Sequence, residues 1–380
     1  MMNFPESIQN ALSAMGIKTF TTIQEKAIPL IAEGKNVIGL SETGSGKTLA
    51  FVLPLTAKII GAAKRPTKIL IITPTKELSE QILAVAKKCA QGTNIISMSL
   101  YGGNSFSEQE RALKNGVHLI VACPGRLKDH IEKNTIDLSG IETVVLDEAD
   151  QLMDMGFLPH IRVAMEATES RKQTLLFSAT MSDEVKILTE EFLTDAEVVE
   201  HKANKTKAII SEIFCPITED LRYPFIRFLL KHYKIKGGLI FTRTKEEARS
   251  LNLLLTEDNY KSAVLEGDMT THQRKKALTG LKEKTINILV ATDIAARGLD
   301  IPHVTHIINL NPPESSDSYV HRVGRTARHD KGGTAITVYM EDEVEYLEDI
   351  LTSQEKVLSP TKFKEFNYNL RIEKRALRII

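Results

Sequence analysis

Short, uninterrupted apolar runs recur along this 380-residue chain, and longer amphipathic stretches separate them. In the first half these runs lie at 36–40, 68–73, 94–100, 118–122, 143–146 and 174–177. A run that is apolar throughout is typical of a strand that is buried on both faces of a parallel sheet. The stretches at 77–89 and 183–193 read as helices. Repeated strand–helix alternation of this kind predicts an α/β fold with helices on both faces of the sheet.

The alternation stops at about 200–211, where the chain is polar and has no periodicity, and then resumes. The second half predicts strands at 238–242, 263–265, 286–291, 305–310 and 335–339, and a helix at 246–255. A chain of this length is too long for one ordinary core. We therefore predict an N-terminal domain at 1–200, a linker at 201–211, a C-terminal domain at 212–365 and a short basic segment at 366–380. The basic segment reads either as a surface helix packed on the second domain or as an auxiliary nucleic-acid contact.

The charge balance excludes one common class of nucleic-acid binder. Lys plus Arg and Asp plus Glu are equal at 49 each, so the formal net charge is zero. Any nucleic-acid site must then be a local groove and not a global basic field. No apolar run is long enough to span a bilayer, and the N-terminus has no secretory pattern. The scattered Cys89, Cys123 and Cys215 have no metal-ligand spacing, so we expect a cytoplasmic protein with reduced thiols and no membrane contact.

A glycine-rich loop follows the first apolar run and precedes an apolar helix expected to begin at Leu49. A glycine turn at a helix N-terminus aims backbone N–H groups at one point, where the helix dipole adds positive potential. Lys47 is expected to reach β- and γ-phosphates, and the Thr48 hydroxyl to ligate Mg²⁺. Ser41 departs from the glycine usual at the first position. The candidate ATP-binding residues here are Ser41, Glu42, Thr43, Gly44, Ser45, Gly46, Lys47 and Thr48.

An acidic cluster, Asp147-Glu148-Ala149-Asp150, follows the apolar run at 143–146. Carboxylates at the C-terminal end of a strand in an open α/β sheet lie where ligands bind. Asp147 is suited to holding Mg²⁺, usually through water. Glu148 is suited to orienting or deprotonating the attacking water. Together with the loop, the cluster predicts ATP hydrolysis.

These residues resemble the motifs of the DEAD-box RNA helicases, and the resemblance covers almost the whole chain. Lys76 stands where Arg is usual in that family, and Cys123 replaces Thr. The matching motifs, in chain order, are TGSGKT at 43–48, PTKELSEQ at 74–81, GG at 102–103, CPGR at 123–126, DEAD at 147–150, SAT at 178–180, LIFTR at 239–243, QR at 273–274, ATDIAARGLD at 291–300 and HRVGRTAR at 321–328.

The resemblance implies two tandem RecA-like domains, each a parallel sheet flanked by helices, with ATP and RNA bound across the cleft between them. Gln24 is implied to read the adenine edge, since its amide offers a donor and an acceptor. Asp300 is implied to accept from the ribose hydroxyls. Phe20 stands where Pro is common and Ile17 where an aromatic residue often stacks on the base, so a weaker adenine selectivity is expected.

The second domain is implied to supply arginines to the ATP site. Arg325 and Arg328 lie three residues apart, so they share one face of a helical turn. Such arginine fingers stabilise the charge that develops in phosphoryl transfer and contribute roughly 10³–10⁵ in rate. Hydrolysis would then require domain closure, which RNA and ATP both favour. Interdomain coupling is implied for Asp150, Ser178, Thr180 and Arg322, and Arg322 is expected to pair with carboxylates of the first domain.

The candidate RNA contacts mix hydroxyls, glycine-turn amides and a few arginines. That inventory suits phosphates and 2′-hydroxyls, so we expect binding of one strand without base specificity. The implied mechanism is local separation of short duplexes. The residues are Pro74, Thr75, Lys76, Gly102, Gly103, Arg126, Arg243, Arg274, Thr292 and Arg297.

Three alternatives remain open at this level: a DNA helicase or translocase, an RNA clamp that does not unwind, and a pseudo-ATPase. Comparing stimulation by RNA and DNA, or hydrolysis with duplex release, would separate them. The expected ligands are ATP, Mg²⁺ and single-stranded or duplex RNA. We expect a monomer with a bacterial or organellar housekeeping role. Its RNA specificity is expected either to come from ribosomal or RNA-decay partner proteins or to be broad.

Overall fold

The computed structural model describes residues 4–42, 44–201, 210–296, 304–326 and 332–370. The chain divides into two compact units, Met1–Asn204 and Lys205–Ile380, and each is described by itself. Within the described residues, no helix has the length and apolar character needed to cross a membrane.

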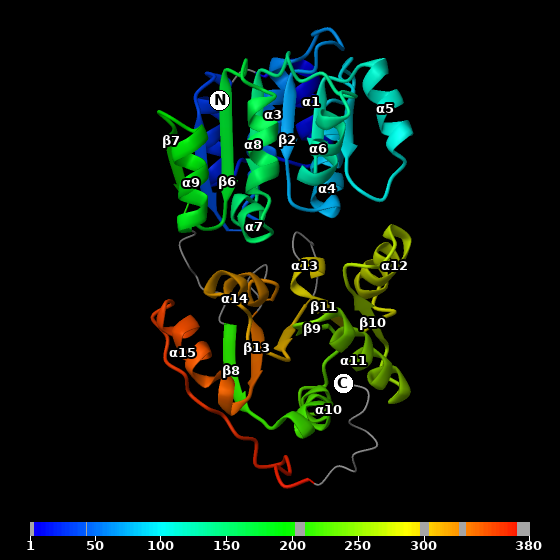
Figure 1. Ribbon diagram of the computed structural model, residues 1–380, viewed down its shortest axis with the longest axis vertical. Helices are drawn as coiled ribbons and strands as arrows, with labels where there is room; N and C mark the ends of the chain where they lie inside the picture. Colours follow the sequence, from blue (N-terminus) through cyan, green and yellow to red (C-terminus); the bar gives the residue numbers. More distant parts are fainter. Residues whose placement is uncertain (1–3, 43, 202–209, 297–303, 327–331, 371–380) are drawn as a thin grey trace. The chain divides into compact units, whose positions relative to one another are not determined.

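The described part of the N-terminal unit contains a seven-stranded parallel sheet with the order β3-β4-β2-β5-β6-β1-β7 (Figure 1). Its strands are β1 Val37–Ser41, β2 Ile69–Ile72, β3 Ser97–Leu100, β4 Leu119–Ala122, β5 Thr143–Asp147, β6 Gln173–Ser178 and β7 Glu197–His201. Its helices are α1 Glu6–Ala14, α2 Thr22–Ala32, α3 Lys47–Lys58, α4 Lys76–Cys89, α5 Phe106–Asn115, α6 Pro124–Glu132, α7 Ala149–Asp154, α8 Leu158–Glu166 and α9 Asp183–Phe192.

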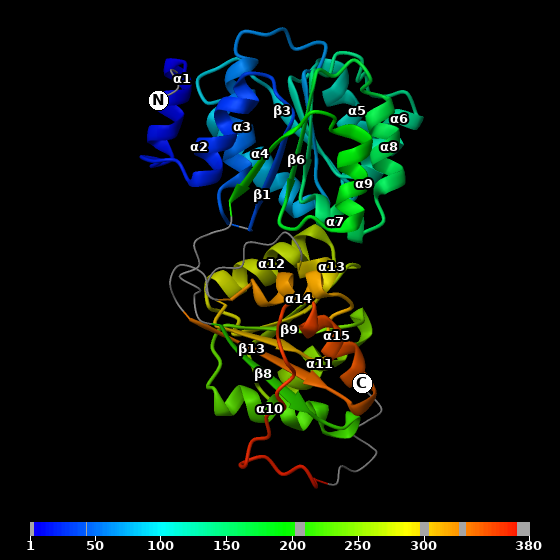
Figure 2. The same cartoon turned by 90° about the vertical axis from the view of Figure 1, so that its left-hand side faces the viewer.

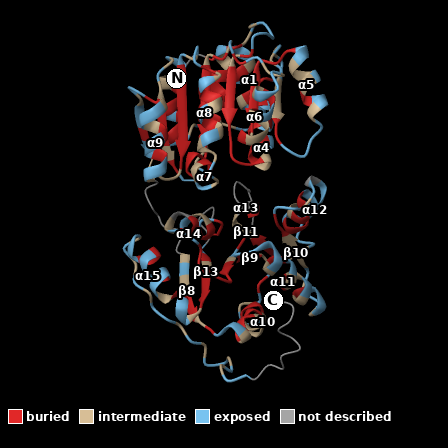
Figure 3. Cartoon of the chain, viewed as in Figure 1, coloured by how far each residue is buried: buried red, intermediate tan, exposed pale blue. Residues whose placement is uncertain are grey.

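Both faces of this sheet are covered, as continuous apolar strands require. One core combines strand residues with side chains from α1, α2, α3 and α4, and the other uses α6, α7, α8 and α9. Figure 2 shows these two sets of helices on opposite sides of the strands. The central strands β2, β4, β5 and β6 are buried along their whole length (Figure 3).

The described part of the C-terminal unit contains a six-stranded parallel sheet with the order β10-β11-β9-β12-β13-β8. Its strands are β8 Ile210–Pro216, β9 Gly238–Thr242, β10 Ser262–Leu265, β11 Ile288–Thr292, β12 His306–Asn309 and β13 Gly333–Tyr339. Its helices are α10 Arg222–His232, α11 Lys245–Glu257, α12 Thr271–Lys282, α13 Asp293–Ala296, α14 Ser316–Val323 and α15 Val344–Thr352, with 3₁₀ turns at Glu219–Leu221 and Glu341–Glu343.

Two cores again flank the sheet. α12, α13, α14 and α15 pack on one face, and α10 and α11 pack on the other, where Phe363, Phe366 and Tyr368 join them. The predicted α/β class, with two parallel sheets flanked by helices, is therefore confirmed. The range predicted as a linker, 201–211, includes strand residues at both of its ends. β7 ends at His201, and β8 begins at Ile210. Helix α3 begins at Lys47, two residues before the predicted start.

Candidate ATP and RNA site

One edge of the N-terminal sheet carries the predicted site residues of this unit. Because all pairings between its strands are parallel, their C-terminal ends meet at the same edge. The candidate ATP residues follow β1 and β5, and the candidate coupling residues follow β5 and β6. The candidate RNA residues follow β2, β3 and β4. The strand order β3-β4-β2-β5-β6-β1 therefore divides this edge into an RNA half and an ATP half that meet between β2 and β5.

The loop between β1 and α3 has the geometry expected of a phosphate loop. Gly44 and Gly46 have φ angles of 85° and 93°, which side chains with a Cβ rarely adopt. A Cβ on Gly46 would also lie 2.3 Å from the Gln24 side-chain nitrogen. The hydroxyl oxygens of Ser41 and Ser45 lie 2.8 Å apart, within hydrogen-bond distance. That contact depends on the serine that departs from the expected glycine.

Lys47 and Gln24 both bond to the backbone of this loop. The buried Lys47 ammonium donates to the Ser41 carbonyl at 2.7 Å. The Gln24 amide accepts from Thr21 N and donates to the Gly46 carbonyl, each at 3.0 Å. The Thr21 hydroxyl donates to the Ser45 carbonyl at 2.8 Å. The start of α2 is thus fastened to the loop, so a ligand that moves the loop also acts on Gln24.

Asp147 and Glu148 lie where β5 turns into α7, and both are buried. Burial, together with the neighbouring Glu148 carboxylate, raises the pKa of Asp147 to about 7, while the Lys47 ammonium acts in the opposite direction. Asp147 also accepts a hydrogen bond from the Glu148 N–H at 3.1 Å. Glu148 has a positive φ of 51°, an uncommon conformation that sharply reverses the chain between strand and helix. A buried carboxylate facing an ammonium fits a site for a metal ion and phosphates.

Asp150 links α7 to the end of β6. Its carboxylate accepts from the backbone N–H groups of Ala179 and Thr180, at 3.0 and 3.1 Å. Its own N–H donates to the Ser178 hydroxyl at 3.2 Å. The DEAD residues and the Ser-Ala-Thr residues therefore form one hydrogen-bonded unit, and a shift of either would displace the other.

On the RNA half, the residues after β2 are partly engaged within the unit. Pro74 and Thr75 are buried, and the Thr75 hydroxyl caps α4 by accepting from Leu78 N at 3.3 Å. The Lys76 ammonium lies 3.8 Å from the Glu77 carboxylate. The Thr75 hydroxyl thus already has a structural role at the start of this helix.

The glycine doublet and Arg126 lie close together, because Arg126 donates to the Asn104 carbonyl at 3.1 Å, just after Gly102 and Gly103. Arg126 also donates to the Gln109 side-chain oxygen at 2.8 Å. Both glycines are exposed, and Gly103 has a φ of 91°. The arginine therefore fixes the loop that presents these glycine amides.

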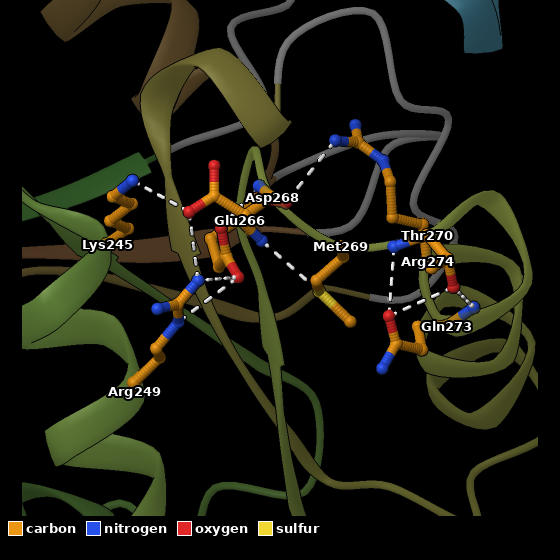
Figure 4. A network of polar contacts seen from close by, with 8 residues as sticks. All are labelled: Lys245, Arg249, Glu266, Asp268, Met269, Thr270, Gln273 and Arg274. Carbon is orange, nitrogen blue, oxygen red and sulfur yellow. Dashed lines mark hydrogen bonds and ion pairs between the residues drawn. The ribbon is translucent and has the colours of Figure 1, made fainter. Parts of the chain in front are cut away.

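In the C-terminal unit, the candidate RNA residues follow the adjacent strands β10, β11 and β9. Thr292 ends β11, and Arg243 follows β9, where its guanidinium bonds to Glu343 at 2.9 Å. Figure 4 shows the buried Arg274 beside the turn that follows β10. Its guanidinium donates to the carbonyls of Glu266 at 3.5 Å and Ala295 at 3.2 Å. Arg274 therefore connects that turn to α13.

Arg322 has a partner within its own unit that the sequence did not predict. Its guanidinium makes a two-pronged contact with Asp293 of its own unit, at 2.6 and 2.7 Å, and also donates to Asn309 and to the Asn311 carbonyl. Asp293 is within reach because it directly follows β11 beside α14. The expected pairing of Arg322 with carboxylates of the first domain stays a prediction. Arg325 is buried just beyond α14. Thr43, Arg297, Asp300 and Arg328 lie outside the described residues.

The comparisons with known proteins agree with this geometry. Residues 21–188 match the DEAD/DEAH box helicase family, and residues 221–330 match the helicase conserved C-terminal domain. An ATP-dependent RNA helicase CshA from Listeria monocytogenes is 39% identical over 356 residues, covering 93% of this chain and 68% of that protein. The chain belongs to the DEAD-box ATP-dependent RNA helicases. The resemblance noted in the sequence is thereby confirmed, and members of this family hydrolyse ATP.

Further relatives extend the same result to the fold. A DEAD-box ATP-dependent RNA helicase CshA from Geobacillus kaustophilus is 37% identical, covering 92% of this helicase and 75% of its own length. The structure of S. cerevisiae Dbp5 bound to RNA and ADP BeF3 matches with a TM-score of 0.81 and 26% identity over 94% of each chain. A DEAD box protein from Methanococcus jannaschii matches with a TM-score of 0.53 and 32% identity, over 95% of this chain and 98% of that one. The helicase therefore has the tandem RecA-like fold.

Sequence reasoning missed several residues that hold the site of this helicase in place. Thr21, Gln109, Asp293 and Glu343 contact Ser45, Arg126, Arg322 and Arg243, respectively. Thr21 had a recognisable signal, because Thr followed three residues later by Gln at the start of a helix is a capping pattern. The other three come from distant segments, and their pairing depends on the tertiary fold.

Proposed function

We propose that this helicase binds single-stranded RNA without base specificity and uses ATP-driven closure of its two domains to separate short duplexes or remodel RNA–protein complexes. The observation that carries the proposal is the shared edge of the N-terminal sheet. Its ATP half and RNA half meet at β2 and β5, which are hydrogen-bonded neighbours. The relatives named as ATP-dependent RNA helicases, and the structure of Dbp5 bound to RNA, support it.

In the proposed mechanism, the phosphate loop and the start of α3 bind the phosphates of ATP through backbone N–H groups. Lys47 leaves the Ser41 carbonyl for a phosphate oxygen. Glu148 orients the attacking water and accepts its proton. The donor set of Thr48 and the buried Asp147 fits Mg²⁺, which needs few protein ligands when phosphates complete its shell. Bound there, Mg²⁺ would neutralise charge on the phosphates.

The described ATP residues of the N-terminal unit include no arginine. We propose that arginines in and just after α14 of the other unit serve the ATP site. Closure would bring Arg325 to the γ-phosphate, and Arg328 is proposed to act beside it. Asp300 is proposed to bind the ribose. RNA and ATP would each favour closure, so each raises the affinity for the other. Arg322 acts indirectly, by holding α14 against Asp293.

For RNA, the proposed contacts are backbone amides, hydroxyls and arginines, which recognise phosphates and 2′-hydroxyls. Gly102 and Gly103 are exposed and free of a Cβ, so a strand can approach their amides closely. Arg126 and Arg274 donate to carbonyls of their own unit. We propose that these two arginines set loop geometry as well as contacting RNA.

The test measures ATP hydrolysis with and without single-stranded RNA or DNA of one sequence composition, beside release of a short labelled RNA duplex. RNA stimulation and ATP-dependent release are expected, and Glu148→Gln should abolish hydrolysis while ATP binding persists. A clear preference for DNA would refute the RNA assignment. Hydrolysis without duplex release would instead favour an RNA clamp.

We further propose that the helicase is a cytoplasmic monomer that acts in ribosome assembly or RNA decay with proteins of those machineries. The support is the similarity to bacterial relatives named RNA helicases. Sequencing the RNA that Glu148→Gln retains in cells would identify the target. Retention of no RNA above the level of a Lys47→Ala control would contradict this role.

A further inference from the structure

A segment after α15 contacts α14, the helix that carries Arg322 and precedes Arg325. This segment lies beyond the matched family region, which ends at residue 330. We call residues 353–368 the C-terminal strap. Figure 1 draws the strap in orange to red, leaving α15 and passing toward α10. None of its residues belongs to a motif identified in the sequence.

The first part of the strap contacts the N-terminal end of α14. The Ser353 hydroxyl bonds to the Ser316 hydroxyl at 2.8 Å, and the Gln354 amide donates to the same hydroxyl at 3.2 Å. Ser316 is the first residue of α14. The strap is therefore hydrogen-bonded to the first residue of this short helix.

The next contact lies beside the middle of α14. The Lys356 ammonium bonds to both carboxylate oxygens of Glu212 on β8, at 2.6 and 2.9 Å. The hydroxyl of the buried Tyr319 donates to the same carboxylate at 2.8 Å, and the ammonium lies 5.4 Å from the Tyr319 ring centroid. Lys356, Glu212 and Tyr319 thus join the strap, the edge strand and α14.

The remainder of the strap is anchored away from α14. Thr361 N donates to the Phe214 carbonyl of β8 at 2.7 Å. Two aromatic residues of the strap contact α10. The ring centroids of Phe366 and Phe225 lie 4.9 Å apart, and those of Phe363 and Phe228 lie 5.4 Å apart. Aromatic contacts of this kind stabilise a structure beyond the area that they bury. This anchorage gives Lys356 a fixed position from which to act on Glu212.

Tyr319 is one helical turn from Arg322 and less than two from Arg325. The helix has only eight residues, from Ser316 to Val323, so its placement depends on its tertiary contacts. Arg322 fixes the far end through Asp293. We propose that Lys356 is a positioning residue for ATP hydrolysis, which through Glu212 and Tyr319 sets the place of α14 and hence of Arg325.

This inference rests on the proposed role of Arg325 in hydrolysis. A displacement of about 1 Å in such a group can lower a rate by up to a hundredfold. Lys356 touches no residue of the phosphate loop among the contacts described, so its loss should act on kcat and not on the KM for ATP.

The experiment compares full-length Lys356→Met, which keeps most of the side-chain length, with Lys356→Arg and with Lys364→Met, an exposed lysine of the same strap. RNA-stimulated kcat, the KM for ATP and the melting temperature are measured for each. Lys356→Met should lower kcat about tenfold with the KM within about twofold of the parent, Lys356→Arg should restore most of the rate, and Lys364→Met should match the parent.

A second comparison separates positioning from folding. In a Glu212→Gln background, Lys356→Met should have little further effect on kcat, because the carboxylate that it acts through is gone. An equal loss in both backgrounds, a kcat within twofold of the parent, or a loss explained by the unfolded fraction would overturn the inference. A parent that shows no RNA-stimulated hydrolysis would instead refute the proposed function.

Discussion

Replacing Asp147 by Asn should stabilise the unliganded N-terminal unit, and the gain should increase with pH. The folded carboxyl has a pKa raised from 3.8 to about 7, chiefly by burial. Between these two pH values the folded state binds more protons than the unfolded state, so stability falls as the pH rises. A shift of about three units at roughly 1.4 kcal/mol each sets an upper limit of about 4 kcal/mol. The destabilisation by Asp147 is absent at pH values below the pKa of the unfolded state and complete above the pKa of the folded state.

Asn should avoid this cost, since it is neutral and its side-chain oxygen can still accept from Glu148 N. Urea unfolding in EDTA without nucleotide, at about pH 5 and about pH 8, measures the difference between variant and parent. The difference should be larger at the higher pH. Asp137→Asn is the matched control, because hydrogen bonds from Ser139 lower the pKa of Asp137. That variant should lose stability at neutral pH.

Two results would refute the reasoning about Asp147. One is the same difference in unfolding free energy between variant and parent at both pH values, and the other is a difference that becomes smaller as the pH rises. Adding ATP and Mg²⁺ gives a further check. Ligands that bind only the folded state raise its stability, so the parent should gain stability and the Asn variant should gain much less.

Three other substitutions test the phosphate loop and its coupling. Ser41→Ala removes the contact with Ser45, an interaction of about 0.5–1.5 kcal/mol, and should lower the KM for ATP in hydrolysis titrations by about two- to tenfold. A higher KM would show that the hydroxyl contacts nucleotide instead. Gly46→Ala should abolish ATP binding measured by calorimetry, because its φ is 93° and a Cβ would meet Gln24 at 2.3 Å. Asp150→Ala leaves the half-buried N–H groups of Ala179 and Thr180 without their acceptor and should lower the unfolding free energy by about 1–3 kcal/mol in urea titrations. Unchanged stability would argue against this link.

The strands that could be predicted from the sequence are those with continuous apolar runs. Each of the eleven predicted strand ranges overlaps a strand of the described structure, and the range at 238–242 coincides with β9. The two strands missed, β7 and β8, both lie at an edge of their sheet. An edge strand has fewer neighbours to bury it, and in β7 only Val199 is buried while Val198 is 60% exposed. Apolar continuity did not reveal β7 and β8, although it revealed the other two edge strands, β3 and β10.

The sequence predicts the candidate site residues by type and order, but it does not predict their contacts. Lys47 and Asp147 follow from the chemistry of a phosphate loop and of a strand end. The pairing of Arg322 with Asp293 could not be deduced, because several carboxylates of the chain were equally suitable. Choosing among them requires knowing that β11 and α14 lie together.

Three cationic groups among the candidate site residues share a feature that bears on how ligands would bind. Lys47 donates to the Ser41 carbonyl, Arg126 to that of Asn104, and Arg274 to those of Glu266 and Ala295. Each cation therefore has a neutral backbone acceptor in the unliganded chain. A phosphate would replace the neutral carbonyl acceptor by an anionic one, which adds the attraction between opposite charges. The net gain at each contact is then the difference between two bonds, and every exchange moves a loop. Ligand binding at these residues would consequently rearrange the loops, which is the property that the proposed coupling between ATP and RNA requires.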